Sequence, residues 1–228
     1  MADVFISYKQ EERVAIERIA TNLRALGLSV WFDASISAGE TFNDEIDREA
    51  RAASAVLVCW SPAARESRWV KAEAMIGFEQ NKLVASYVAG PDAFSPPTPF
   101  NTSHIQDLRG WLAAASDTDA SWKSVLRRIG KLCNRADIES WGALPTHSSA
   151  DALRVWISAH PSSPLLLVAN KLLRERDAEE AERARPEYET RERGAQEEVQ
   201  RQSEEEVERG EQEASEGRAL AKRRAQEP

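Results

Sequence analysis

The chain contains little cysteine and little histidine. Its 228 residues include two cysteines, Cys59 and Cys133, and three histidines. Cys59 lies in an apolar run and Cys133 in a helical pattern, so we interpret both as reduced core residues. This interpretation excludes a disulfide framework, and the spacing excludes a zinc site. With so few histidines, no Ser/His/Asp arrangement for nucleophilic catalysis can be argued, and we expect no bound metal.

Long apolar runs and an excess of positive charge are also absent. No stretch approaches the roughly 20 apolar residues of a membrane span. The N-terminus "MADVFISYKQ" lacks the basic-then-apolar layout of a signal peptide. The formal net charge is −8, so the chain has no basic field for nucleic acid or anionic lipid. We expect a cytoplasmic, soluble protein with neither nucleic acid nor a membrane as partner.

The negative charge is concentrated near the C-terminus. Residues 174–228 contain 18 acidic and 12 basic side chains, whereas residues 1–173 hold all seven tryptophans and all six phenylalanines. The core must therefore lie in the first part of the chain. The tail from 177 to 228 lacks heptad apolar positions, so coiled-coil evidence is poor. Either a solvated helix or disorder fits its composition, and we interpret it as a solubilising extension.

Strand-like and helix-like patterns alternate along the first 135 residues. The run "SAVLVCW" (54–60) is almost wholly apolar, as in a central strand covered on both faces. Ile16, Ile19 and Leu23 fall at helical spacing. The alternation predicts a parallel sheet with helices on both faces. We expect strands at 3–8, 28–33, 54–60, 82–89 and, as a short edge strand, 107–111; helices at 10–27, 42–53, 67–81 and 119–133; and loops at 61–66 and 90–106.

A different helical pattern follows residue 135. Residues 148–176 predict two helices around "HPSSP", with Ser162 or Ser163 capping the second and Pro164 in its first turn. This is an αα-hairpin, and its apolar stripes require a packing surface on the preceding domain or on a partner. The predicted organisation is an α/β domain at 1–135, a helical hairpin appendage at 136–176 and a charged tail at 177–228.

The stretch "SRWVKAEA" (67–74) places an aromatic side chain and an acid on one helix face. Trp69 and Glu73 are four residues apart, and Ser67 is positioned to cap the helix. In parallel sheets, ligands bind beyond the carboxyl ends of the strands, and this helix begins at that edge. Two ordinary alternatives stand beside this: Trp69 as core and Glu73 as a solvated acid.

Four motifs occur in order: "DVFISYKQEE", "GLSVWFDASISAGETFNDEIDREARAASAVLVCWSP", "SRWVKAEA" and "PFNTSHIQDLRGW". Together they resemble a bacterial Toll/interleukin receptor (TIR) domain, over about residues 1–135. The resemblance implies a flavodoxin-like α/β fold. Some members of this family cleave NAD+ at the nicotinamide–ribose bond, and others only assemble with other TIR domains. In the enzymes, the catalytic glutamate follows a tryptophan by four residues, as Glu73 follows Trp69.

The resemblance also implies residues that bind the dinucleotide. NAD+ is the substrate, so no cofactor is expected, and the absence of a GxGxxG motif after the first strand excludes a Rossmann-type site. Phe32 stands where many members have an arginine. The implied substrate-binding residues lie in the first two loops and on the helix of Glu73: Ser7, Tyr8, Lys9, Trp31, Asp33, Gly39 and Trp69.

The chemistry requires few groups. Nicotinamide in NAD+ is already a cationic leaving group, so cleavage needs stabilisation of an oxocarbenium-like ribose rather than a general acid. One carboxylate with hydrogen bonds to the ribose can supply it. The product is either ADP-ribose or a cyclic ADP-ribose, and a non-catalytic adaptor is the alternative function. On either reading, the resemblance implies that the loop 33–42 contacts a second TIR domain, so self-association or other TIR domains are the expected protein partners.

Overall fold

The computed structural model describes residues 1–32, 42–114 and 116–224. Within it the chain divides into two compact units, Met1–Arg174 and Glu175–Pro228. The first unit contains the sheet and nearly all of the buried apolar side chains. The domain boundaries predicted at 135 and 176 stay predictions.

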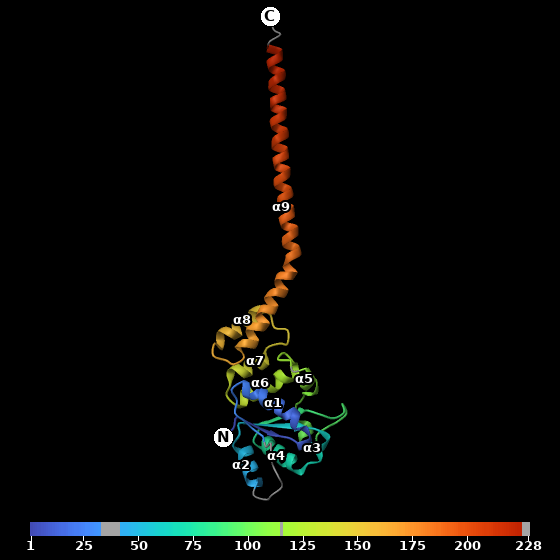
Figure 1. Ribbon diagram of the computed structural model, residues 1–228, viewed down its shortest axis with the longest axis vertical. Coiled ribbons are helices and arrows are strands. Elements are labelled where there is room, and N and C mark those ends of the chain that lie inside the picture. The colour runs from blue at the N-terminus through green and yellow to red at the C-terminus, as the bar shows by residue number, and fades with distance from the viewer. Residues whose placement is uncertain (33–41, 115, 225–228) are drawn as a thin grey trace. The chain divides into compact units, whose positions relative to one another are not determined.

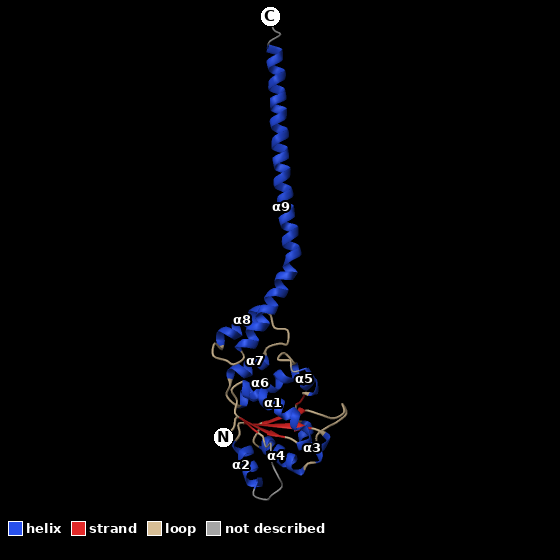
Figure 2. Cartoon of the chain, in the orientation of Figure 1, coloured by secondary structure: helices blue, strands red, loops and turns tan. Residues whose placement is uncertain are grey.

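The first unit is built on a five-stranded parallel sheet with the order β2-β1-β3-β4-β5. The strands are red in Figure 2. This order, with β1 between β2 and β3, is that of flavodoxin-like folds and confirms the predicted fold class. The central strand β3 is buried along its whole length, as its apolar run requires. The strands are β1 (Val4–Ser7), β2 (Val30–Trp31), β3 (Ala55–Trp60), β4 (Leu83–Tyr87) and β5 (Ile105–Asp107).

Helices cover both faces of the sheet (Figure 1). Helices α1, α5 and α6 contribute to one hydrophobic cluster, and α2, α3 and α4 contribute to the cluster on the other face. Within the first unit the helices are α1 (Arg13–Ala25), α2 (Phe42–Ala52), α3 (Pro62–Glu66), α4 (Arg68–Glu79), α5 (Arg109–Ala114), α6 (Ala120–Leu132), α7 (Ala136–Ala143), α8 (Ala150–Ala159) and the start of α9 (Leu166–Arg224), with short 3-10 helices η1 (Gln10–Glu12) and η2 (Phe100–Thr102).

Two local predictions are wrong. The expected loop at 61–66 is helix α3, because the Ser61 hydroxyl accepts a hydrogen bond from the Ala64 N–H at 3.1 Å and Pro62 occupies the first turn. The expected edge strand at 107–111 is instead the end of β5 and the start of α5. Leu108 and Trp111 are buried three residues apart, which is helical rather than strand spacing.

The helices after residue 135 share the core of the sheet domain. Trp156 of α8 and Ala169 of α9 belong to the same hydrophobic cluster as Ile19 of α1. Helices α8 and α9 lie on either side of "HPSSP", as predicted, and Ser163 is the residue that accepts from the Leu165 N–H, at 3.2 Å. Helix α7 was not predicted from the sequence. The hairpin was expected to pack on the preceding domain or on a partner, and in this structure it packs on the preceding domain.

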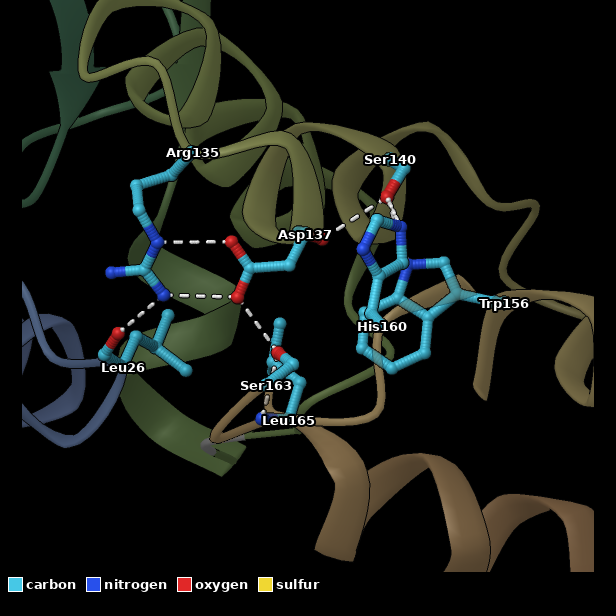
Figure 3. Close-up of polar contacts among 8 residues, drawn as sticks. All are labelled: Leu26, Arg135, Asp137, Ser140, Trp156, His160, Ser163 and Leu165. Atoms are coloured by element: carbon cyan, nitrogen blue, oxygen red, sulfur yellow. Dashed lines mark hydrogen bonds and ion pairs between the residues drawn. The ribbon is translucent and has the colours of Figure 1, made fainter. Parts of the chain in front are cut away.

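A partly buried polar network fixes the turn between α8 and α9 to α7 (Figure 3). Arg135 donates to both carboxylate oxygens of Asp137 at 2.9 Å and to the Leu26 carbonyl oxygen at the end of α1 at 3.0 Å. Ser163 donates to the same carboxylate at 2.8 Å. Burial raises the pKa of Asp137, but the hydrogen bonds from Arg135 and Ser163 outweigh it, so the pKa lies below its ordinary value. The carboxylate is therefore ionised at neutral pH and joins three segments.

Helices α6 and α7 approach closely and enclose Lys123. A Cβ atom at Gly130 or Gly142 would collide with backbone of the facing helix, so both positions require glycine. Lys123 is 4% exposed; its ammonium group donates to the Pro145 carbonyl oxygen at 3.2 Å and lies 5.4 Å from the ring centroid of Trp141. Burial lowers the pKa of Lys123 to about 8.

Replacing Lys123 by methionine is expected to stabilise the protein at pH 7, by about 1–3 kcal/mol, because a buried charge is removed. The Pro145 carbonyl still accepts from Ser148. With its pKa lowered from 10.5 to about 8, Lys123 takes up a proton on unfolding between these pH values. Its contribution to the free energy of unfolding therefore rises with pH across that window. Melting temperatures from pH 7 to 10 should show the gain of Lys123→Met shrinking toward high pH; a constant difference contradicts this.

The second unit is the remainder of α9, which extends to Arg224. Apart from the half-buried Arg176, its described side chains are exposed. Neighbouring turns are joined by ion pairs such as Arg176–Glu179 at 2.6 Å and Arg201–Glu198 at 2.7 Å. Of the two alternatives for the tail, the structure shows the helix. In the described part of the chain, no helix combines the length and apolarity needed to cross a membrane.

Candidate functional site

The site lies where β1 and β3 end side by side. Ser7, the last residue of β1, is paired with Val58 of β3, and β1 also pairs with β2 on its other side. The connections from β1 and β3 run in opposite directions, and sheets of this class bind ligands beyond the carboxyl ends of two such neighbouring strands. Helix α4 begins at this same edge, after the Ser67 hydroxyl accepts a hydrogen bond from the Val70 N–H at 3.4 Å.

Ser7 and Glu73 meet at this edge of the sheet. The Ser7 hydroxyl donates to the Glu73 carboxylate with a distance of 2.5 Å between Oγ and Oε2. Ser7 is 1% exposed, whereas Glu73 is half-buried. The serine therefore holds one carboxylate oxygen, and the fold brings together two sequence-predicted residues that are 66 positions apart.

Trp69 is on the surface beside this pair. It is 52% exposed, so the alternative that it is a core residue is wrong. It lies one helical turn before Glu73 on the same face of α4. The Arg68 guanidinium lies over its indole, with 5.4 Å between the Arg68 Cζ atom and the ring centroid. An exposed indole next to a carboxylate can stack against a flat aromatic ligand.

Other predicted site residues are placed for packing. Trp31 stacks on Phe5 with 4.9 Å between ring centroids, in the cluster beneath α4. The ring of Tyr8 contacts the edge of Phe32, with 6.2 Å between ring centroids. Tyr8 packs against the hydrophobic cluster on the other face of the sheet, which includes α1 and α6. These contacts favour a packing role for Trp31.

For three predicted site residues, Lys9, Asp33 and Gly39, the structure gives no information about a role in the site. Lys9 is half-exposed and immediately precedes η1. Asp33 and Gly39 lie outside the residues that the structure describes, as does the tip of the loop 33–42. Arg68 was not predicted as a site residue; its signal in the sequence is a basic residue at the first position of the helix, next to Trp69.

A separate cavity of about 480 Å³ opens near the amino ends of β4 and β5. Neither Ser7 nor Glu73 lines it, so it is not part of this site. Its walls come from the end of α4, β4, the segment around β5, and α6: Phe78, Asn81, Leu83, Val84, Ala85, Ser103, His104, Gln106, Ser124, Val125 and Arg128.

Comparisons with known proteins identify the domain that carries the site. A family model described as "TIR domain" matches residues 4–125, which is more than half of the chain. Among solved structures, the chain is similar to the TIR domain of the Toll-related receptor TRR-2 from the lower metazoan Hydra magnipapillata. The identity is 18% and the TM-score 0.45, and the match covers 57% of this chain and 98% of that chain. A search of curated proteins finds no match. The family match confirms the resemblance seen in the sequence motifs: the chain belongs to the TIR domain family.

Proposed function

We propose that the protein is an NAD+ glycohydrolase, which cleaves the bond between nicotinamide and ribose. The observation that carries the proposal is the Ser7–Glu73 hydrogen bond at the carboxyl edge of β1 and β3. It supplies a single oriented carboxylate at the crevice where this class of sheet binds ligands. Trp69 supplies an exposed aromatic surface one turn away.

In the proposed mechanism, Glu73 acts electrostatically. As the glycosidic bond breaks, the electron pair leaves with nicotinamide, which becomes neutral, and positive charge develops on the ribose. The Glu73 carboxylate stabilises that charge, and no proton donor is required. Ser7 fixes the carboxylate, so little reorganisation is needed during the reaction. Attack by water then gives ADP-ribose, and attack by an adenine nitrogen gives a cyclic ADP-ribose.

The test is nicotinamide release from NAD+ by the purified full-length protein, followed by chromatography of nicotinamide and the ADP-ribose product. We expect nicotinamide and one ADP-ribose species in equal amounts, and the second peak identifies hydrolysis or cyclisation. A TIR domain that functions only by assembly releases no nicotinamide, and that result contradicts the proposal.

We place the protein in the cytoplasm. Both cysteines are free thiols, which supports a reducing location.

We also propose that activity depends on self-association. The sequence of the loop 33–42, "DASISAGETF", carries an apolar Ile36 among small and polar residues. Turnover per molecule is expected to rise with protein concentration, because a second copy contributes this loop. Ile36→Asp should reduce activity at high concentration while leaving the melting temperature unchanged. The measurement is specific activity over a hundredfold dilution series, and a constant value for wild type with a fully active Ile36→Asp variant would mean that each monomer holds a complete site.

A further inference from the structure

We infer that Arg68 binds a phosphate group of the dinucleotide and thereby sets the preference of the site for NAD+ over nicotinamide ribosides that lack phosphate. The inference rests on the proposed function, because it concerns the same crevice. It assigns a role to a residue that the sequence motifs leave without one.

The position of Arg68 is defined by its neighbours. It is the first residue of α4 and directly follows the Ser67 cap. Its guanidinium lies over the indole of Trp69, 5.4 Å from the ring centroid. Trp69 in turn shares a helix face with Glu73, one turn further along. The Arg68 guanidinium therefore lies next to the site, at the N-terminal end of α4, where the backbone dipoles also favour anions.

The charges of substrate and site require such a cation. NAD+ carries two phosphate groups, and it must approach the Glu73 carboxylate on a part of the chain, residues 1–173, with 20 acidic and 18 basic side chains. Without a local positive charge, the phosphates and the protein repel each other. A guanidinium pairs with phosphate through two parallel N–H donors, which makes arginine well suited to this contact.

Arg68 is available for this role, whereas another arginine at the same edge of the sheet is occupied. Arg109, which follows β5, donates to the Asp107 carboxylate and to the Gly90 carbonyl oxygen, and it also pairs with Asp92. Arg68 is exposed, and within the described residues it has no acidic partner; its contact is the ring of Trp69. An exposed cation–π contact is worth only about 0.5–1 kcal/mol, so a phosphate can draw the guanidinium away at little cost.

The test compares substrates with and without phosphate. Arg68→Met is expected to lower kcat/KM for NAD+ by about 10- to 100-fold, mainly by raising KM, since a charge-assisted hydrogen bond to phosphate is lost. Cleavage of nicotinamide riboside, which has no phosphate, should stay within about twofold of wild type. Arg68→Lys should restore part of the activity on NAD+ because it restores the charge. Lys71→Met is the matched control: it removes one positive charge from the same helix, about 160° around the axis from both Trp69 and Glu73.

The results of these assays decide whether Arg68 binds phosphate. An unchanged kcat/KM for NAD+ in Arg68→Met, or an equal loss on NAD+ and nicotinamide riboside, overturns the role of Arg68. If wild type cleaves neither substrate, the proposed function has failed, and calorimetric binding of ADP-ribose then tests Arg68 separately. If only NAD+ is cleaved, the same binding measurement is used. Weaker binding by Arg68→Met but not by Lys71→Met supports the inference, and equal or absent binding by all proteins overturns it.

Discussion

Replacing Glu73 by glutamine is expected to slow nicotinamide release from NAD+ by about a hundred- to a thousandfold. Glutamine has the same shape and still offers an oxygen to the Ser7 hydroxyl, which lies 2.5 Å from the carboxylate. What it lacks is the negative charge that stabilises the ribose as positive charge develops. Removing one group that stabilises transition-state charge costs a factor of this size in well-studied enzymes. The loss should appear in kcat rather than in KM, because the charge develops only as the bond breaks.

Glu79→Gln is the matched control for this experiment. Glu79 is the next acid on α4, it is exposed, and it lies about 120° around the helix from Glu73. Its variant should keep activity within about twofold of wild type. Melting temperatures of both variants should match wild type, which separates a catalytic loss from unfolding. Equal nicotinamide release by Glu73→Gln and wild type would remove Glu73 from the catalytic role.

The edge of the sheet that carries the site follows from the pattern of the sequence. The apolar run of β3 and the alternation of strands with helices indicate a parallel sheet, and a parallel sheet places its functional loops at one edge. The contact between Ser7 and Glu73 does not follow from the pattern, because it joins segments 66 positions apart. The resemblance to a family brought both residues into consideration, and the structure shows that they touch.

Ser7 and Tyr8 were both predicted to bind the substrate, but the alternation of side chains along a strand places them on opposite faces of the sheet. Consecutive side chains of a strand point to opposite faces, so Ser7 and Tyr8 at the end of β1 face different helix layers. The structure places Ser7 beneath α4 and packs Tyr8 against the cluster on the other side. Alternation alone therefore argues against a shared contact with one ligand.

The unpredicted elements depend on contacts that no local pattern reports. Helix α7 has only Ile138 and Trp141 as buried apolar side chains, which is too short a signal for a helix. It is held by close packing on α6 across Gly130 and Gly142, and this packing exists only in the folded chain. Arg68 was overlooked for a related reason: a single exposed arginine has no periodicity, and only its position over Trp69 distinguishes it.

Replacing Trp156 by alanine is expected to destabilise the first unit by about 3–5 kcal/mol, a large part of the stability of a domain of this size. Trp156 is 4% exposed and contacts the edge of Trp141 with 5.0 Å between ring centroids. Its indole N–H also donates to the Ser140 hydroxyl at 2.9 Å (Figure 3). The substitution therefore leaves a cavity and removes a hydrogen bond. The melting temperature should fall by about 6–20 °C.

Two further variants separate the contributions. Val155→Ala is the matched control, since Val155 is 70% exposed on the same helix and its truncation should change stability by no more than about 0.5 kcal/mol. Trp156→Phe keeps most of the packing and loses the N–H, so it should cost about 1–2 kcal/mol, much of it from the lost bond to Ser140. An unchanged melting temperature in Trp156→Ala would mean that α8 is not packed in solution.

The shape of the unfolding transition tests the shared core. Trp156 belongs to the same hydrophobic cluster as Ile19 of α1 and Leu57 of β3. Helices that contribute to one core unfold with it, so Trp156→Ala should lower the midpoint of a single transition reported equally by tryptophan fluorescence and circular dichroism. An early, separate transition of the helices in this variant, with the sheet melting at the wild-type temperature, would instead show that α8 stabilises only its own neighbours. The single transition is the expected result because the Arg135–Asp137–Ser163 network also connects the α8–α9 turn to the end of α1.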